Sequence, residues 1–177
     1  MLMSLQQRFL LDVLKRLGCV KRKQLYLLAA KNLSLPEWKV EQRHVDIMLN
    51  QLRCCTGEIR MDADLVYYGR ASPDSEQLEA VDVMLELSEG KPSDFRLERD
   101  ECLLLRFMLE SEGKLRLFGV ARFREDTARL LPAHRTERII FLADKAELPV
   151  GLVLPYRHFF ALRQEDGTHR FFAGGEQ

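Results

Sequence analysis

The 177-residue chain lacks several features that would place it in a broad class of protein. No apolar run approaches the roughly 18 residues that a membrane-spanning helix needs, so we expect no membrane partner. The N-terminal segment is interrupted by Gln6, Arg8 and Asp12 and precedes no small-residue cleavage site, which is unlike a secretory signal peptide. These absences favour a cytoplasmic protein.

Motifs for catalysis or cofactor binding are also missing. The four cysteines include the adjacent pair Cys54 and Cys55 but form no C-x-x-C, and the four histidines show no ligand spacing with them. We therefore expect reduced thiols and no metal site. Neither glycine-rich phosphate motif is present, and no nucleophile-elbow sequence surrounds a serine. The sequence thus predicts no cofactor, no catalytic residue and no enzymatic activity.

Net charge is zero over the whole chain but is divided unevenly along it. Residues 1–72 hold twelve Lys/Arg and seven Asp/Glu, a net charge of +5, whereas residues 73–177 hold fifteen and twenty, a net charge of −5. Such a division indicates different partners for the two halves. The basic half is the candidate for binding nucleic acid.

Three helical patterns and a hairpin pattern fill the basic half. Apolar side chains recur at helical spacing, and Ser34 followed by Glu37 is a capping-box pattern. The expected helices cover 4–17, 21–31 and 36–53, and the expected strands cover 56–61 and 65–68, with a turn at 62–64. Three helices followed by a hairpin is the element order of a winged helix. We therefore predict an N-terminal winged-helix domain over residues 1–70.

The expected third helix has distinct apolar and polar faces. Its inward face holds Trp38, Val45, Met48, Leu49 and Leu52, and its polar face holds Lys39, Gln42, Arg43, Asp46 and Asn50. Lys, Arg, Gln and Asn carry donors that match base edges and phosphates. We predict that Lys39, Gln42, Arg43 and Asn50 contact double-stranded DNA, the first three from the turns that reach bases.

Further cations are expected to contact the DNA backbone. Lys21, Arg22 and Lys23 open the expected second helix, where three adjacent charges favour phosphate contact without reading sequence. Arg60 lies on the expected wing. The tip of that wing carries Asp62 and Asp64, which disfavours deep insertion into the minor groove.

A third stripe on the same helix supports an alternative function. It consists of Val40, His44, Ile47 and Gln51, and its two apolar members would be unusual in open solvent. Contact with the second domain or with a partner chain, as in a homodimer, would cover them. A winged helix that binds protein rather than DNA therefore remains open.

The second half predicts an α+β domain over residues 74–177, after a boundary at 69–74 that is rich in Gly, Ser, Pro and Asp. Helices are expected at 75–88 and 125–131, strands at 95–98, 102–110, 115–123 and 138–143, and a last hairpin at 156–163 and 169–173. The order αβββαβ is that of the PD-(D/E)xK nuclease-like fold. Gly174 and Gly175 are expected to be a flexible tail.

The catalytic pattern of those nucleases is poorly placed. Asp94, in Pro-Ser-Asp, precedes a literal Glu-x-Lys at Glu112 and Lys114, but both of these fall in an expected turn, where side chains are exposed and unsuited to fixing a metal. The following strand, 115–123, has no carboxylate. We expect a scaffold without catalysis that serves dimerisation, partner docking or ligand sensing.

In this element order the chain resembles replication-relaxation-like proteins of bacterial plasmids and conjugative elements. The resemblance depends on an N-terminal winged helix, a short linker and a strand-rich domain, and on residues 103–105 and 138–144. It implies an accessory DNA-binding role in the replication or conjugative transfer of a mobile element, with relaxase or replication proteins as partners. The other interpretation left open is a winged-helix transcription regulator whose second domain senses an effector.

Overall fold

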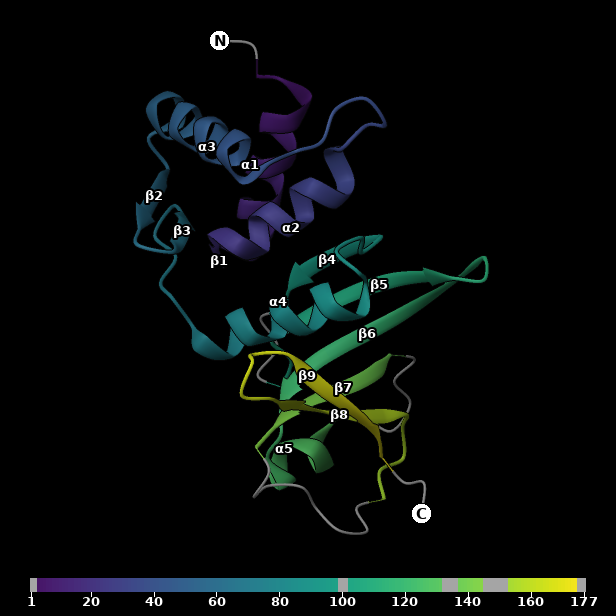
Figure 1. Cartoon of the computed structure of the whole chain (residues 1–177). Coiled ribbons are helices and arrows are strands. Elements are labelled where there is room, and N and C mark those ends of the chain that lie inside the picture. Colours follow the sequence, from purple (N-terminus) through teal and green to yellow (C-terminus); the bar gives the residue numbers. More distant parts are fainter. Residues whose placement is uncertain (1–2, 99–101, 132–136, 145–152, 175–177) are drawn as a thin grey trace.

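The computed structural model describes residues 3–98, 102–131, 137–144 and 153–174 and shows a mixed α+β fold with two sheets (Figure 1). In chain order the elements are α1 (Leu5–Leu17), β1 (Cys19–Lys21), α2 (Arg22–Leu33), α3 (Gln42–Thr56), β2 (Ile59–Asp62), β3 (Leu65–Tyr68), α4 (Ser75–Leu87), β4 (Asp94–Leu97), β5 (Leu105–Ser111), β6 (Lys114–Arg122), α5 (Glu125–Leu130), β7 (Arg138–Ala143), β8 (His158–Arg163) and β9 (His169–Ala173). No described helix has the length and apolar character needed to cross a membrane.

The N-terminal unit, from α1 to β3, contains the three helices and the hairpin that the sequence predicts. Helix α1 begins where the Ser4 hydroxyl accepts a hydrogen bond from the Gln7 amide, and it ends at Gly18, which has a φ of +66°. Strands β2 and β3 pair antiparallel, which confirms the hairpin. Leu14, Leu28 and Leu49, one from each helix, are fully buried between them.

Strand β1 was not predicted. It has only three residues, too few to show an alternating pattern, and its partner β3 lies more than forty residues further along the chain. The pairing of Val20 with Val66 inserts β3 between the other two strands, so the small sheet has the order β1-β3-β2. This sheet fixes the hairpin against the start of α2.

Helix α3 begins at Gln42 rather than at Pro36, so the predicted start was wrong. The Ser34 hydroxyl accepts from the Val40 amide instead of capping a helix, and Leu35 and Trp38 exchange two backbone hydrogen bonds of 2.8 and 3.1 Å in a tight turn. That turn uses the backbone groups that the expected first helical turn would need. The helix starts at Gln42 because the preceding amide, that of Glu41, donates to His44 Nδ1.

The larger sheet has the strand order β4-β5-β6-β7-β8-β9. Strands β4, β5 and β6 are antiparallel neighbours, β7 and β8 continue parallel to β6, and β9 returns antiparallel at the edge. Helix α4 covers one face of it (Figure 1). On the other face Phe123 packs edge to face against Phe141 and Phe160, in a cluster that includes Ala128 of α5.

Several predictions in this half differ from the structure. Strand β5 begins at Leu105 rather than at 102, although the Leu104 amide still donates to the Val120 carbonyl of β6. Gly174 does not behave as a tail: its amide donates to the His158 carbonyl at 3.0 Å, and a Cβ there would lie 1.9 Å from His158 Nε2. Gly175 lies outside the described residues.

Helix α4 joins the two sheets through one hydrophobic cluster. Val81, Val83 and Met84 are almost fully buried, although they point in different directions around the helix. The cluster continues on one side to Leu14 and Leu28 of the N-terminal unit and on the other to the sheet face. The sheet contributes Phe107, Phe118, Val120, Ile140 and Leu142.

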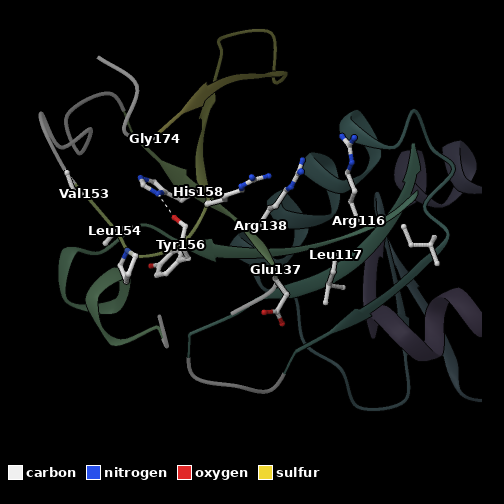
Figure 2. Close-up of a pocket in the computed structure, with 12 residues that line it drawn as sticks. Arg116, Leu117, Glu137, Arg138, Val153, Leu154, Tyr156, His158 and Gly174 are labelled. Carbon is white, nitrogen blue, oxygen red and sulfur yellow. Dashed lines mark hydrogen bonds between the residues drawn. The ribbon is translucent and has the colours of Figure 1, made fainter. Parts of the chain in front are cut away.

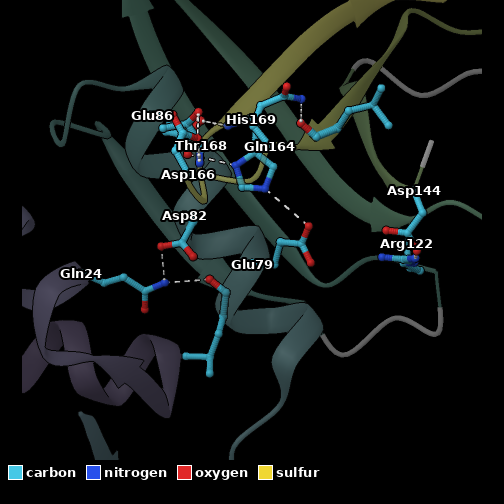
Figure 3. Close-up of polar contacts among 12 residues, drawn as sticks. Gln24, Glu79, Asp82, Glu86, Arg122, Asp144, Gln164, Asp166, Thr168 and His169 are labelled. Atoms are coloured by element: carbon cyan, nitrogen blue, oxygen red, sulfur yellow. Dashed lines mark hydrogen bonds and ion pairs between the residues drawn. The ribbon is translucent and has the colours of Figure 1, made fainter.

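Charged and polar groups add to this junction (Figure 3). Lys21 Nζ lies 2.6 Å from Asp82 of α4, and Gln24 Nε2 donates to the Leu78 carbonyl at 2.7 Å. Arg16 of α1 forms an ion pair with Asp94 of β4. The N-terminal unit is therefore attached to both α4 and the edge of the larger sheet.

A buried histidine holds β9 against α4. His169 Nδ1 lies 2.9 Å from Glu86 and Nε2 lies 3.4 Å from Glu79, and only 1% of the His169 side chain is exposed (Figure 3). Burial by itself lowers the pKa of His169, but the hydrogen bonds to Glu79 and Glu86 outweigh it and raise that pKa above its ordinary value. The same contact lowers the pKa of Glu79.

Because one cluster spans both sheets, replacing Met84 with alanine should destabilise the whole chain by about 2–5 kcal/mol. We expect the urea midpoint to fall by the same amount whether unfolding is measured by Trp38 fluorescence or by far-UV circular dichroism. Leu115→Ala, at a site that is 65% exposed, is the control and should change stability by about 0.5 kcal/mol or less. A Trp38 transition that stays in place while the dichroism shifts would show that the units unfold separately.

Replacing His169 with glutamine should cost more stability at pH 6 than at pH 9. A histidine whose pKa is raised by folding adds to the free energy of unfolding. This stabilisation is fully present at pH values below the pKa of the unfolded chain, about 6.5, and is lost as the pH rises through the pKa of the folded chain. We expect the two losses to differ by about 1 kcal/mol, since charged hydrogen bonds are stronger than neutral ones. Urea titrations of both proteins at pH 6 and pH 9 measure the difference. Equal losses of stability at the two pH values would contradict the prediction.

Candidate nucleic-acid interface

The outward face of α3 carries polar side chains that no other element covers. Gln42, Arg43 and Asn50 are all exposed, and α3 lies on the side of the N-terminal unit away from the larger sheet (Figure 1). The face is not strongly positive, because Arg43 Nε lies 2.9 Å from Glu41 and Asp46 projects from the same side. Its donors are therefore available, but its net charge is small.

Lys39 lies outside the helix, contrary to the prediction. It is exposed in the segment between the Leu35–Trp38 turn and α3. The apolar stripe that included Val40 also differs from the prediction, since Val40 is 3% exposed and belongs to the core. Of the two apolar members of that stripe, Val40 and Ile47, Ile47 is the exposed one, at 54%.

The start of α2 lies beside the polar face of α3. Arg22 Nη1 is 3.4 Å from Asp46, and the Arg22 amide donates to the Asp64 carbonyl at the hairpin tip. Lys23 is exposed, whereas the Lys21 ammonium is held by Asp82 of α4. Of the three adjacent cations, Lys23 is thus the one without an ion pair among the described residues.

Arg60 stands on β2 with part of its hydrogen-bonding capacity already used. Its guanidinium lies 5.3 Å from the Tyr67 ring centroid and donates to the Ala71 carbonyl. Asp62 and Asp64 at the tip are exposed. The structure therefore brings Arg22 beside α3 and leaves Arg60 on the hairpin, whereas Lys23 lines a hollow between α2 and α4 together with Glu86.

Sequence reasoning missed further residues on the α3 face. Arg53 and Cys54 are exposed and lie on the same side as Gln42 and Asn50 at 100° per residue. The helix runs three residues beyond its predicted end, to Thr56, which is why Cys54 was left out. A C-cap signal was present in Gly57, which has a φ of +66°.

The nuclease-like residues do not come together. Asp94 pairs with Met108 on β5, and Glu112 follows Met108 by four residues. At 3.3 Å per residue, this separation places Glu112 about 13 Å from Asp94 along the chain direction. Glu112 is 83% exposed and lies 3.6 Å from Arg116. Within the described ranges, no group of three or more His, Cys, Asp or Glu side chains is arranged to hold a metal ion.

No protein-family model, curated protein or solved structure matches the chain.

Gln24 is the buried polar residue on which the start of α2 depends. It is 1% exposed, its Oε1 accepts from the Lys21 amide, and its Nε2 donates to Leu78 and Asp82. Leucine at this site would leave these partners unsatisfied, so Gln24→Leu should cost about 2–3 kcal/mol in urea unfolding. The exposed Gln42→Leu is the matched control, with an expected change of about 0.5 kcal/mol or less. Equal effects of the two substitutions would contradict this role.

Proposed function

We propose that the N-terminal unit is a winged helix that binds double-stranded DNA, with α3 in the major groove. The observation that carries the proposal is the polar face of α3, which no described element covers and which lies next to Arg22 of α2. A helix in the major groove must be packed on one face and expose donors on the other. Val45, Leu49 and Leu52 provide the packed face.

The topology of the N-terminal unit supports the winged-helix assignment. The order α1-β1-α2-α3-β2-β3, with a small sheet in the order β1-β3-β2, gives three helices backed by a hairpin. The hairpin tip is held at the start of α2 by the Arg22–Asp64 hydrogen bond. It therefore forms a wing beside α3 rather than a separate arm.

The side chains on α3 suit direct contact with bases. Arg43 can donate to guanine, and Gln42 and Asn50 can bond to adenine. The exposed Ile47 lies on the neighbouring stripe, beside Arg43, and apolar contact with a thymine methyl group is a recognised form of base readout. An isolated apolar side chain among polar ones is thus compatible with a groove-facing helix.

Phosphate contact would come from fewer cations than the sequence suggests. Lys39 is exposed and can approach the backbone, while Lys21 would have to leave Asp82 and Lys23 faces a hollow on the α4 side of α2. The net charge of +5 over residues 1–72 favours association with DNA. The acidic second half favours an approach through the N-terminal unit alone.

The second half is proposed to be a nuclease-like scaffold without catalysis. The helix α4, the antiparallel strands β4, β5 and β6, the helix α5 and the parallel strand β7 follow the αβββαβ order. Its strand β6 carries no carboxylate. An accessory protein of mobile-element replication or transfer, docking partner proteins or a second copy through this half, fits such a scaffold.

A transcription regulator that senses an effector is the second candidate. It is favoured by a cavity of about 1040 Å³ at one end of the larger sheet, lined in part by arginines. Both candidates require DNA binding by the N-terminal unit.

Arg43→Ala should weaken binding of a random-sequence duplex of about 25 base pairs by roughly fivefold or more, because a donor at the centre of the α3 face is lost. Fluorescence anisotropy across a salt titration measures the affinity. Lys114→Ala removes the same charge from the exposed turn of the second half and should leave the affinity unchanged.

Two results would contradict the proposal. Absence of duplex binding by the wild-type chain at low salt would remove DNA binding altogether. Equal affinities for Arg43→Ala and the wild-type chain would remove α3 from the interface.

A further inference from the structure

The larger sheet has a hollow at one end that the proposed DNA contact does not use. Its volume is about 1040 Å³, and it lies where β7 and β8 begin (Figure 2). Arg116, Arg138 and Arg157 line it, together with apolar side chains that include Leu117, Leu154 and Tyr156. Three arginines in one hollow need a physical explanation, because like charges repel.

The strand register gathers the three arginines on one face. Arg138 pairs with Phe118 across β6 and β7, and Arg116 precedes Phe118 by two residues, so the side chains of both arginines lie on the same face. Ile139 pairs with His158, which places Arg157 beside Arg138 on the next strand. Figure 2 shows Arg116 and Arg138 projecting in the same direction. Adjacent strands are about 4.8 Å apart, so the charges form a short row.

Little within the described part of the chain neutralises this row. Arg116 lies 3.6 Å from Glu112, which is 83% exposed, and no described carboxylate is within ion-pair distance of Arg138 or Arg157. Glu137 also lines the hollow, but it lies 3.2 Å from Arg106. Burial, together with the charges of Arg116 and Arg157, lowers the pKa of Arg138. Among the described residues, the row therefore has unmatched positive charge.

Contact with the Phe118 ring restricts the direction in which the Arg138 guanidinium can point. Its guanidinium carbon lies 5.9 Å from the centroid of the Phe118 ring, which is itself 9% exposed. Stacking on a ring leaves the donors in the guanidinium plane free to form two parallel hydrogen bonds with an oxyanion. Phosphate is the group that arginines recognise in this way most often besides carboxylate.

The apolar side chains that line the hollow belong to the other face of the sheet. Leu117 alternates with Arg116 along β6, and Leu154 and Tyr156 pack with the cluster beneath α5, where the Tyr156 hydroxyl donates to the Ala128 carbonyl. Recognition in the hollow therefore depends on the arginine row. The concave shape and the net charge of −5 over residues 73–177 disfavour duplex DNA here.

We propose that this hollow binds a phosphate-bearing small molecule of nucleotide size. Its phosphates would contact Arg116, Arg138 and Arg157. The site is separate from the α3 face, so it does not require the proposed DNA contact.

Isothermal titration of the full chain with metal-free ATP at low salt tests the proposal. We expect saturable binding that Arg157→Gln, and separately Arg138→Gln, weakens by about tenfold or more, because each loses a charge-assisted contact. Arg170→Gln, on β9 and outside the hollow, is the control and should bind as the wild-type chain does. Melting curves without ligand establish that each variant is folded.

Two results would overturn the proposal. The first is the absence of saturable ATP binding by the wild-type chain. The second is binding that both variants leave unchanged.

A duplex-binding measurement on Arg157→Gln separates this site from DNA contact. The affinity for DNA is expected to be unchanged. Loss of duplex binding in Arg157→Gln would assign the arginine row to DNA and overturn the small-molecule site, whereas loss in Arg43→Ala alone leaves the site intact.

Discussion

Helix α4 buries side chains on almost its whole circumference, and this burial determines how the rest of the molecule is arranged. A helix exposed on one side can bury a single stripe, but Ala80, Val81, Val83 and Met84 need contacts in several directions. The N-terminal helices supply some of these contacts and the larger sheet supplies the others. Neither part could leave α4 without exposing an apolar surface to water.

This arrangement decides which cations of the N-terminal unit are free. The packing of α2 against α4 brings Lys21 to Asp82 and buries Gln24 beneath Leu78. Helix α3 lies away from the larger sheet and keeps its polar face exposed (Figure 1). The proposed DNA contact therefore depends on α3 more than on the adjacent basic residues that open α2.

The two halves use charge in different ways. On α3, donors of base-matching type are interspersed with Glu41 and Asp46, so that shape and hydrogen bonding would contribute more to recognition than net charge does. In the hollow of the larger sheet, Arg138 and Arg157 stand side by side, and no described carboxylate pairs with them. A row of that kind arises from parallel register, in which equivalent positions on neighbouring strands face the same side.

Much of the secondary structure could be predicted from local sequence, since periodicity and capping act over a few residues. The strand 138–143, the helix from Ser75 and the hairpin of β2 and β3 are confirmed on that basis. The start of α3 could not be predicted, because the Leu35–Trp38 turn competes with the capping pattern at Ser34. The three-residue strand β1 was equally inaccessible, because only its pairing with β3 defines it.

The sequence by itself determined the element types, the division of charge and the residue types on α3, because these depend on composition and near neighbours. Tertiary structure decided that Val40 is core, that Lys21 is paired and that three arginines far apart in the chain share one hollow. The physical reason is the separation in sequence over which each interaction acts. Burial, ion pairing and strand register join residues whose separation in the sequence bears no relation to their distance in the fold.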